Sequence, residues 1–353
     1  MKKRVVVGLS GGVDSSVAAL LLKEQDYEVI GLFMRNWHET GDNGVCTAEE
    51  DYSDVKRVCS TLDIPFYSVD FSDEYNDRVF KHFVEEYKKG RTPNPDVLCN
   101  KEIKFGPFIE HAKKLGADMI ATGHYAGTVR KDGHTYLIRA ADEDKDQTYF
   151  LNQLTEKQIE NVIFPLQDIK DKTLVREKAK KAGLITHDKK DSTGICFIGE
   201  RRFRGFLSRY IPMQEGDIIC DGKIVGTHKG IYYYTLGQRK GLGIGGDTDG
   251  QRWFVTGKDV TKNILYVSQG EDDRLYSEQL VTEDFNFING KPDNSGFDCL
   301  VRIRHRQFLQ KAFAKIVNGM VELKFEKPQR AITSGQYAVL YNDKTVIGGG
   351  VIK

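Results

Sequence analysis

The opening segment, residues 4–34, constrains the fold of this chain more than any other feature. Residues 4–9 are an apolar run rich in Val, residues 14–25 follow a helical pattern, and residues 27–34 return as a second apolar strand. Two strands separated by one helix predict a β-α-β unit, because parallel strands need a crossover connection of about that length. The chain is therefore expected to open with a parallel sheet.

The same alternation continues along the first half of the chain. Further strand-like runs occupy residues 64–69 and 118–121. Helical patterns surround them, at residues 48–62, 73–89, 101–114 and 172–181. Strands that alternate with helices of this length predict an α/β fold with a doubly wound parallel sheet.

The pattern changes after residue 205, where helical periodicity ends and glycines become frequent. Short strand-like runs follow, at residues 253–256, 264–267, 299–303, 321–325 and 337–341. A length of 353 residues corresponds to two or three domains. We expect a doubly wound domain over residues 1–205, a small central α/β or β domain over residues 206–275, and a C-terminal β-barrel over residues 276–353.

Charge, cysteine content and hydropathy argue against several classes of protein. A formal net charge of +1 argues against binding of polyanions through overall charge, but it permits local basic patches. Six cysteines without a C-x-x-C pair argue against a disulfide scaffold and a structural zinc site. The longest helical apolar run, residues 17–22, is far shorter than the ~20 residues of a membrane span. We therefore expect a cytoplasmic protein with no membrane segment and no protein-bound metal cluster.

The phosphate loop, residues 10–16, joins the first strand to the first helix. Its glycines let the backbone approach a ligand closely, and the free N–H groups of a helix start attract an anion. Asp14 would act there through a bound Mg²⁺ or by orienting donors. The alternative is an ordinary β-α turn with an Asp cap. The string Ser-Gly-Gly-Val-Asp-Ser at 10–15 resembles the PP-loop of ATP pyrophosphatases, which cleave ATP to AMP and pyrophosphate.

Two cysteines lie in segments that favour a reactive thiolate. Cys99 follows the turn-rich residues 90–98 and precedes Lys101, and Cys196 lies in residues 191–199 with arginines just after it. Nearby cations lower the pKa of a thiol and so favour the nucleophilic form. Three other cysteines are expected to be buried packing residues, namely Cys59, Cys220 and Cys299. Cys46 is not assigned a role.

Seven motifs in order resemble the tRNA-specific 2-thiouridylase family, which replaces the C2 oxygen of the wobble uridine with sulfur. They lie at residues 10–16, 31–34, 90–105, 121–125, 145–147, 190–199 and 235–243. The resemblance implies a PP-loop domain, a central domain and a C-terminal β-barrel. It also implies ATP with Mg²⁺, the anticodon loop of tRNA as substrate, and a persulfide donor such as a cysteine desulfurase or sulfur-carrier protein.

The resemblance implies roles for matching residues as well. Cys99 would be the nucleophile and Cys196 the persulfide carrier, while Asp96 would act as an acid or base. ATP would contact Gly8, Leu9, Ser10, Gly11, Gly12, Val13, Asp14, Ser15, Met34 and Gly123. The target base would contact Asn94, Pro95 and Asp96. The rest of the tRNA would contact His124, Lys145, Asp146, Gln147, Arg304, His305 and Gln336, with His305 standing where relatives can carry Tyr.

Elementary chemistry agrees with this interpretation. The C2 oxygen of uracil leaves only after activation, and adenylation by ATP turns it into AMP. A persulfide on Cys196 can then supply sulfur, and Cys99 can close a transient disulfide that releases the product or sulfide. Two thiols and an adenylating loop suffice for this route.

Local charge indicates where RNA would bind. Residues 301–330 hold eight Lys or Arg against two Glu, and residues 200–209 hold four Arg against one Glu. A solvated charged face is the simpler explanation, but cations beside a predicted reactive cysteine favour RNA. Two rival functions remain open: an ATP pyrophosphatase that transfers nitrogen to a carbonyl, and a non-catalytic tRNA-binding module with a relic nucleotide loop.

Overall fold

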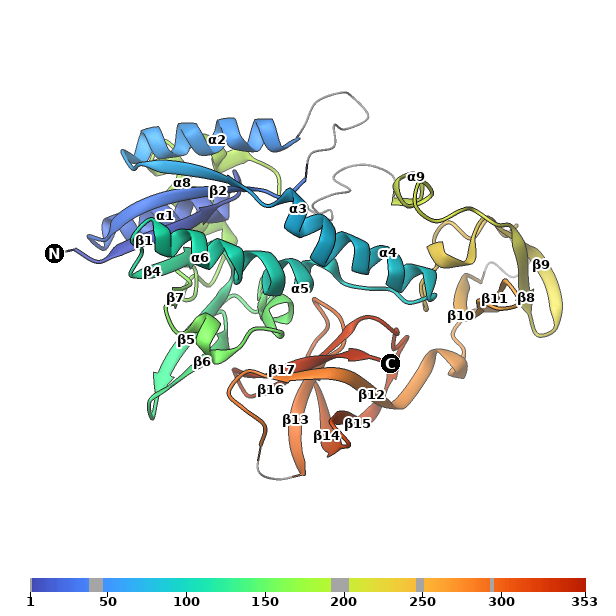
Figure 1. Cartoon of the computed structure of the whole chain (residues 1–353). Coiled ribbons are helices and arrows are strands. Elements are labelled where there is room, and N and C mark those ends of the chain that lie inside the picture. The colour runs from blue at the N-terminus through green and yellow to red at the C-terminus, as the bar shows by residue number, and fades with distance from the viewer. Residues whose placement is uncertain (1, 38–46, 192–202, 246–250, 293–294) are drawn as a thin grey trace.

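The computed structural model describes residues 2–37, 47–191, 203–245, 251–292 and 295–353 (Figure 1). The N-terminal domain is built on a five-stranded sheet of order β3-β2-β1-β4-β7, and every pairing in it is parallel. Its strands are β1 (Arg4–Leu9), β2 (Glu28–Arg35), β3 (Phe66–Asp70), β4 (Met119–Thr122) and β7 (Val162–Ile163). The predicted doubly wound parallel sheet is confirmed.

The sheet has an apolar core on each face. Val5 and Val7 of β1 join one core, whereas Val6, which lies between them, joins the other. Successive side chains of a strand point to opposite faces, so a continuous Val run requires helices on both sides. The first core is completed by α1 (Val13–Glu24), α2 (Thr47–Leu62) and α8 (Lys172–Lys181), and the second by α4 (Lys81–Lys88) and α6 (Pro107–Lys114).

The helix expected over residues 101–114 begins earlier and is interrupted. It starts at Pro95, whose fixed φ suits the first helical position, and it breaks at Gly106 before Pro107 restarts it. Cys99 therefore lies in a helix and not in the expected loop. The segments are α5 (Pro95–Cys99), η2 (Asn100–Lys104) and α6. The helix before them is likewise divided, into α3 (Ser72–Tyr75), η1 (Asn76–Phe80) and α4.

The middle of the chain forms a separate four-stranded sheet of order β10-β11-β8-β9. Its elements are α9 (Phe203–Leu207), β8 (Gly216–Cys220), β9 (Lys223–His228), η5 (Ile231–Tyr233), β10 (Trp253–Asp259) and β11 (Ile264–Gln269). The short elements elsewhere are η3 (Thr148–Leu151), α7 (Glu156–Ile159), η4 (Ile185–Asp188) and η6 (Asp273–Leu275).

The C-terminal strands form a closed barrel of order β12-β15-β14-β13-β16-β17, which closes through pairing of β12 with β17. They are β12 (Tyr276–Phe287), β13 (Gly296–Arg302), β14 (Gln310–Val317), β15 (Met320–Arg330), β16 (Tyr337–Asn342) and β17 (Thr345–Ile352). The expected barrel is confirmed. A hairpin from the N-terminal domain, β5 (Ala126–Lys131) and β6 (His134–Arg139), extends this sheet through Ile138 opposite Thr345 and was missed by the sequence analysis. Within the described parts of the chain, no helix combines the length and apolar character of a membrane span.

A buried ion pair fastens residues 140–147 to the barrel. Asp146 is 1% exposed, and its carboxylate accepts a hydrogen bond of 2.9 Å from Arg302 Nη1 and lies 3.6 Å from Arg139 Nε. Thr148 Oγ1 also donates to this carboxylate. The expectation that Asp146 contacts tRNA does not fit this position, because its oxygens are buried and already engaged.

We predict that Asp146→Asn lowers the free energy of unfolding by ~3–5 kcal/mol, because it leaves buried Arg302 without its counter-charge. The matched control is Glu143→Gln, which removes an exposed partner of Arg139 and is expected to cost less than about 1 kcal/mol. Urea unfolding of both variants measures this difference. Unchanged stability of Asp146→Asn together with weaker tRNA binding would instead make Asp146 an RNA contact.

Candidate active site

The phosphate loop lies at the carboxyl end of β1, where it enters α1. Ser15 Oγ donates to Gly12 O at 3.1 Å and accepts from Ser10 N at 3.2 Å, so the loop is closed on itself. Gly11 has φ +76°, and a Cβ there would lie 2.8 Å from Asp51 O. Only glycine satisfies both the left-handed backbone and the close packing on α2.

Neighbouring strands bring the other predicted ATP residues to the same edge of the sheet. Gly8 of β1 pairs with Thr122 of β4, and Met34 lies near the end of β2 beside them. Gly123, directly after β4, packs so closely on α1 that a Cβ would lie 2.6 Å from Ser15 N. The carboxyl edge of a parallel sheet is where such folds bind ligands.

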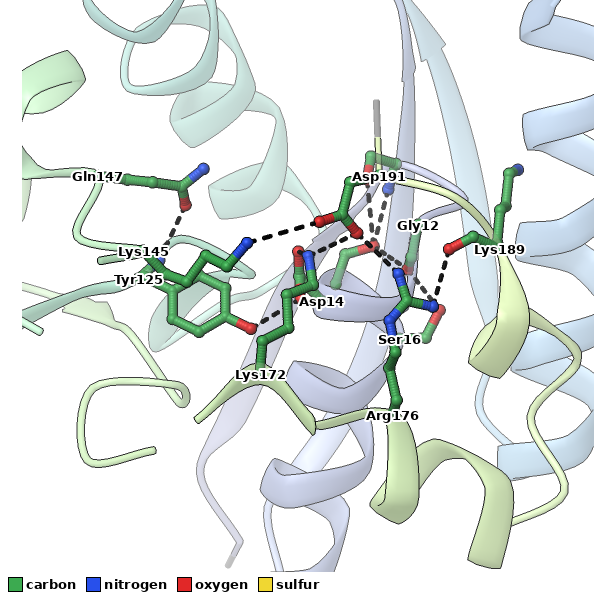
Figure 2. Close-up of polar contacts among 12 residues, drawn as sticks. Gly12, Asp14, Ser16, Tyr125, Lys145, Gln147, Lys172, Arg176, Lys189 and Asp191 are labelled. Atoms are coloured by element: carbon green, nitrogen blue, oxygen red, sulfur yellow. Dashed lines mark hydrogen bonds and ion pairs between the residues drawn. The ribbon is translucent and has the colours of Figure 1, made fainter. Parts of the chain in front are cut away.

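A network of charges adjoins the loop (Figure 2). Asp14 accepts a hydrogen bond from Tyr125 Oη at 3.0 Å and pairs with Lys172 Nζ at 2.9 Å. Lys172 also pairs with Asp191 at 2.7 Å, and Arg176 Nη2 donates to the same carboxylate at 2.9 Å. Lys172 and Arg176 were not predicted from the sequence. Two cations four residues apart at the start of a helix were the available signal.

The helix α5 carries the predicted base-contacting and thiol residues. Asn94 stands at its N-cap position without a side-chain hydrogen bond to the helix, and Cys99 is its last residue, 5% exposed within the second core. The expected polar, turn-rich setting of Cys99 is therefore wrong, because the Pro95 helix start turns it inward. Asp96 lies on the same helix, where burial raises the pKa of its carboxyl and Lys104 opposes this.

His124 lies between the phosphate loop and this helix. Its Nδ1 is 2.8 Å from Thr122 Oγ1, and its ring centroid is 6.2 Å from that of Phe105. Burial, followed by the charge of Lys104, holds the pKa of His124 well below its ordinary value. The imidazole is thus neutral at pH 7, while Asp96 is more readily protonated than an exposed carboxyl. Groups shifted in this way are suited to moving protons.

The segment before α5, residues 90–94, is held by both other domains. Lys258 Nζ donates to Gly90 O at 2.5 Å, and Thr92 Oγ1 lies 3.3 Å from Thr235 Oγ1. From the barrel, Gln336 Nε2 donates to Thr92 O at 2.8 Å. Gln336, predicted to contact tRNA, here anchors the backbone that leads to Asn94.

The remaining predicted RNA contacts differ in how far they are engaged. The guanidinium of Arg304 is half-buried and donates to Ala331 O at 2.8 Å and to Leu236 O at 3.2 Å. The ring of His305 contacts that of Phe150 in a tilted arrangement with centroids 4.4 Å apart. Burial, aided by nearby arginines, lowers the pKa of His305 to about 4. Gln147 Oε1 accepts from Tyr125 N at 2.9 Å.

The other described cysteines differ in burial. Cys59 and Cys299 are buried, and burial raises the pKa of each to about 12, so both are packing residues as predicted. Cys220 is only half-buried, because it ends a strand beside Asp221. Cys46 and the predicted persulfide carrier Cys196 lie outside the described residues.

Comparison with known proteins matches the chain along almost its whole length. Family models match a tRNA methyl transferase HUP domain at residues 3–200, a tRNA methyl transferase PRC-barrel domain at 204–269, and an aminomethyltransferase beta-barrel domain at 277–352. A solved structure of the U34-tRNA thiolase NcsA from Methanococcus maripaludis, with its 4Fe-4S cluster, is 20% identical. The superposition covers 59% of this chain and 65% of the NcsA chain, at a TM-score of 0.39.

Two proteins named tRNA-specific 2-thiouridylase MnmA, from two strains of Staphylococcus aureus, are far more similar. Each is 55% identical over 355 residues, covering 99% of this chain and 95% of the relative. The chain therefore belongs to the tRNA-specific 2-thiouridylase family.

Proposed function

We propose that this chain replaces the C2 oxygen of the wobble uridine of tRNA with sulfur, using ATP to activate that oxygen. The observation that carries the proposal is the turn after β4. Its residue Gly123 packs on the phosphate loop, and the next residue, His124, lies against Phe105 in the segment that follows Cys99. A nucleotide on the loop and a base at α5 would thus meet at one turn.

The phosphate loop suits the phosphates of the proposed ATP. The start of α1 offers free N–H groups, and Ser10 and Ser15 add hydroxyls beside them. Asp14 suits Mg²⁺, because that ion is usually held by one or two carboxylates together with substrate phosphates. Mg²⁺ would neutralise phosphate charge when ATP is bound. Among the described residues, no cluster of three or more His, Cys, Asp or Glu side chains could form an all-protein metal site.

The chemistry proceeds in three displacements. The uridine C2 oxygen attacks the α-phosphorus of ATP, and pyrophosphate leaves. The outer sulfur of a persulfide on Cys196 then attacks C2, and AMP leaves. Finally the Cys99 thiolate attacks Cys196 Sγ and breaks the persulfide S–S bond, which leaves sulfur on C2 and forms a Cys99–Cys196 disulfide. A thiol reductant resets the enzyme, and release of sulfide by Cys99 before attack on C2 is the alternative order.

Asp96 is the proposed proton acceptor in the first displacement. Removing the N3 proton of uridine makes the C2 oxygen a better nucleophile. The half-buried carboxyl of Asp96, whose pKa burial raises, is suited to that transfer. Asn94 and Pro95 would position the base beside it.

The rival functions differ in their products. A nitrogen-transferring ATP pyrophosphatase would consume ammonia and form no thionucleoside, and a binding module would release no pyrophosphate. We also propose that a cysteine desulfurase or a sulfur-carrier protein donates the persulfide, and that the protein works in the cytoplasm. Mass spectrometry of nucleosides from tRNA incubated with protein, ATP and a persulfide source separates these functions, and it would also detect a methylated product.

We predict that Cys196→Ser abolishes thiolation while ATP binding persists, because the persulfide can no longer be loaded. Cys99→Ser is expected to accept the persulfide but to stall before release. In the wild type, non-reducing peptide mapping after a single turnover is expected to find the Cys99–Cys196 disulfide, which requires Cα atoms within ~6 Å of each other.

The control for this experiment is Cys220→Ser. Because Cys220 lies in the central sheet, this variant is expected to thiolate tRNA like the wild type. A Cys99→Ser/Cys196→Ser double variant that still forms 2-thiouridine would refute the mechanism.

We predict that Asp96→Asn slows thiolation by ~10²–10⁴-fold, the usual contribution of a positioned acid or base. In the wild type the rate is expected to fall as the pH drops through the raised pKa of Asp96, because protonation removes the acceptor. The pH–rate profile of single turnover measures this. The same acidic fall in Asp96→Asn would assign the titration to another group.

A further inference from the structure

Residues 90–92, which lead from α4 to α5, lie between the central domain and the barrel (Figure 1). Gly90 has φ +78°, and a Cβ there would lie 2.5 Å from Val260 Cγ2, in the turn after β10. From the barrel side, Thr92 N donates to Ser334 O at 2.9 Å. The backbone is therefore held from both sides before α5 begins.

Lys258 of β10 supplies a polar contact from the central domain. Its Nζ donates to Gly90 O at 2.5 Å and to Tyr234 O at 2.9 Å. Both acceptors are backbone carbonyls, and no carboxylate of the described residues forms an ion pair with this ammonium. The ammonium therefore ties the N-terminal domain to the segment that follows η5 in the central domain.

Two prolines stiffen the link between this tie and the residues proposed to meet the target base. Pro93 and Pro95 each have a fixed φ, and a residue that precedes proline is biased toward extended conformations. Asn94, between them, is extended, with φ −114° and ψ 97°. A shift of Gly90 is thus passed along the chain to the start of α5, which carries Asp96.

We propose that Lys258 is a positioning residue for thiolation, because it fixes the backbone at Gly90 and thereby aligns Asn94 and Asp96 with the target base. This rests on the proposed function, in which both residues meet the uridine. A misplacement of ~1 Å can slow a reaction by about 10²-fold. The proposed nucleotide site is held separately, by the packing of Gly123 on α1, so ATP binding is not expected to depend on Lys258.

The charge of Lys258 makes this role depend on pH. Burial lowers the pKa of Lys258 from its ordinary value of 10.5 to about 8. A charge-assisted hydrogen bond is about twice as strong as a neutral one, so the tie weakens as the pH rises through the lowered pKa. The same ionisation stabilises the fold over that range, because the unfolded chain then binds more protons than the folded one. A rate that falls there reports alignment and not unfolding.

The neighbouring groups do not account for a change near this pKa. The charged side chains on the elements around Lys258 have other partners, and they are Arg91, Arg204 and Asp259. Burial raises the pKa of the two nearby phenols, Tyr87 and Tyr233. An alkaline fall in rate is therefore assigned to Lys258.

The test compares single-turnover thiolation of tRNA, measured by mass spectrometry of nucleosides, with ATP binding, measured by calorimetry. Lys258→Met removes both hydrogen bonds and is expected to slow thiolation by about 10–100-fold, while ATP binds as to the wild type. Lys258→Arg keeps a cation and is expected to restore most of the rate. The matched control is Lys262→Met, which removes an exposed cation from the same hairpin and is expected to match the wild type in both measurements.

A pH series provides a second readout. The ratio of the wild-type rate to the Lys258→Arg rate is followed from about pH 7 to about pH 9.5, so that titrations common to both proteins cancel. The ratio is expected to fall as Lys258 loses its proton, because the guanidinium stays charged throughout. This series also decides the case in which Lys258→Met does not fold.

The outcomes separate this proposal from the proposed function. Thiolation that Lys258→Met leaves unchanged would refute the positioning role and leave the proposed function intact. Loss of ATP binding together with thiolation would make Lys258 a support of the whole fold and would overturn the proposal, as would a ratio that stays constant with pH. A wild-type protein that forms no thionucleoside would refute the proposed function, and this proposal with it.

Discussion

The close contact between Gly123 and the first turn of α1 is the constraint on which the candidate active site depends. Since a Cβ at this position would meet Ser15 N at 2.6 Å, the chain can pass here only without a side chain. Through this contact the turn after β4 packs on the phosphate loop, and the next residue, His124, lies near the ring of Phe105. Two consecutive residues, Gly123 and His124, thus connect the proposed nucleotide-binding part of the site with the proposed thiol part.

The central domain and the barrel act on this site through backbone contacts. Both converge on residues 90–94, which lead into α5: Lys258 holds Gly90 O, and Gln336 holds Thr92 O. Burial lowers the pKa of Lys258 to about 8, so this ammonium is desolvated at the junction and relies on its carbonyl partners. Arg304 adds a link from the barrel to Leu236 O. These contacts orient Asn94 and Asp96 without contributing a reacting group.

The residues predicted to contact RNA differ in how far other parts of the protein already engage them. The carboxylate of Asp146 forms a buried ion pair with Arg302, and the guanidinium of Arg304 donates hydrogen bonds to backbone carbonyls. By contrast, Phe308 is 85% exposed and the side chain of Lys311 is 76% exposed. Exposed aromatic rings and cations are the kinds of side chain that bind unpaired bases. Phe308 and Lys311 are therefore more exposed than the half-buried Arg304 and His305, which were predicted to contact RNA.

The sequence by itself determined the parallel sheet, the phosphate loop and the barrel. Each follows from local signals: the Val run of β1, the glycines at 11 and 12, and the alternation of apolar residues in strands such as β16. Only the tertiary structure decided the grouping of Lys145, Lys172 and Arg176 around Asp191, the hairpin of β5 and β6 on the barrel, and the burial of Cys99. Lys145 and Lys172 are remote in sequence, and the pairing of Ile138 with Thr345 spans most of the chain. Such contacts leave no periodic trace in the sequence, because they depend on where whole elements pack and not on the local conformation of any one of them.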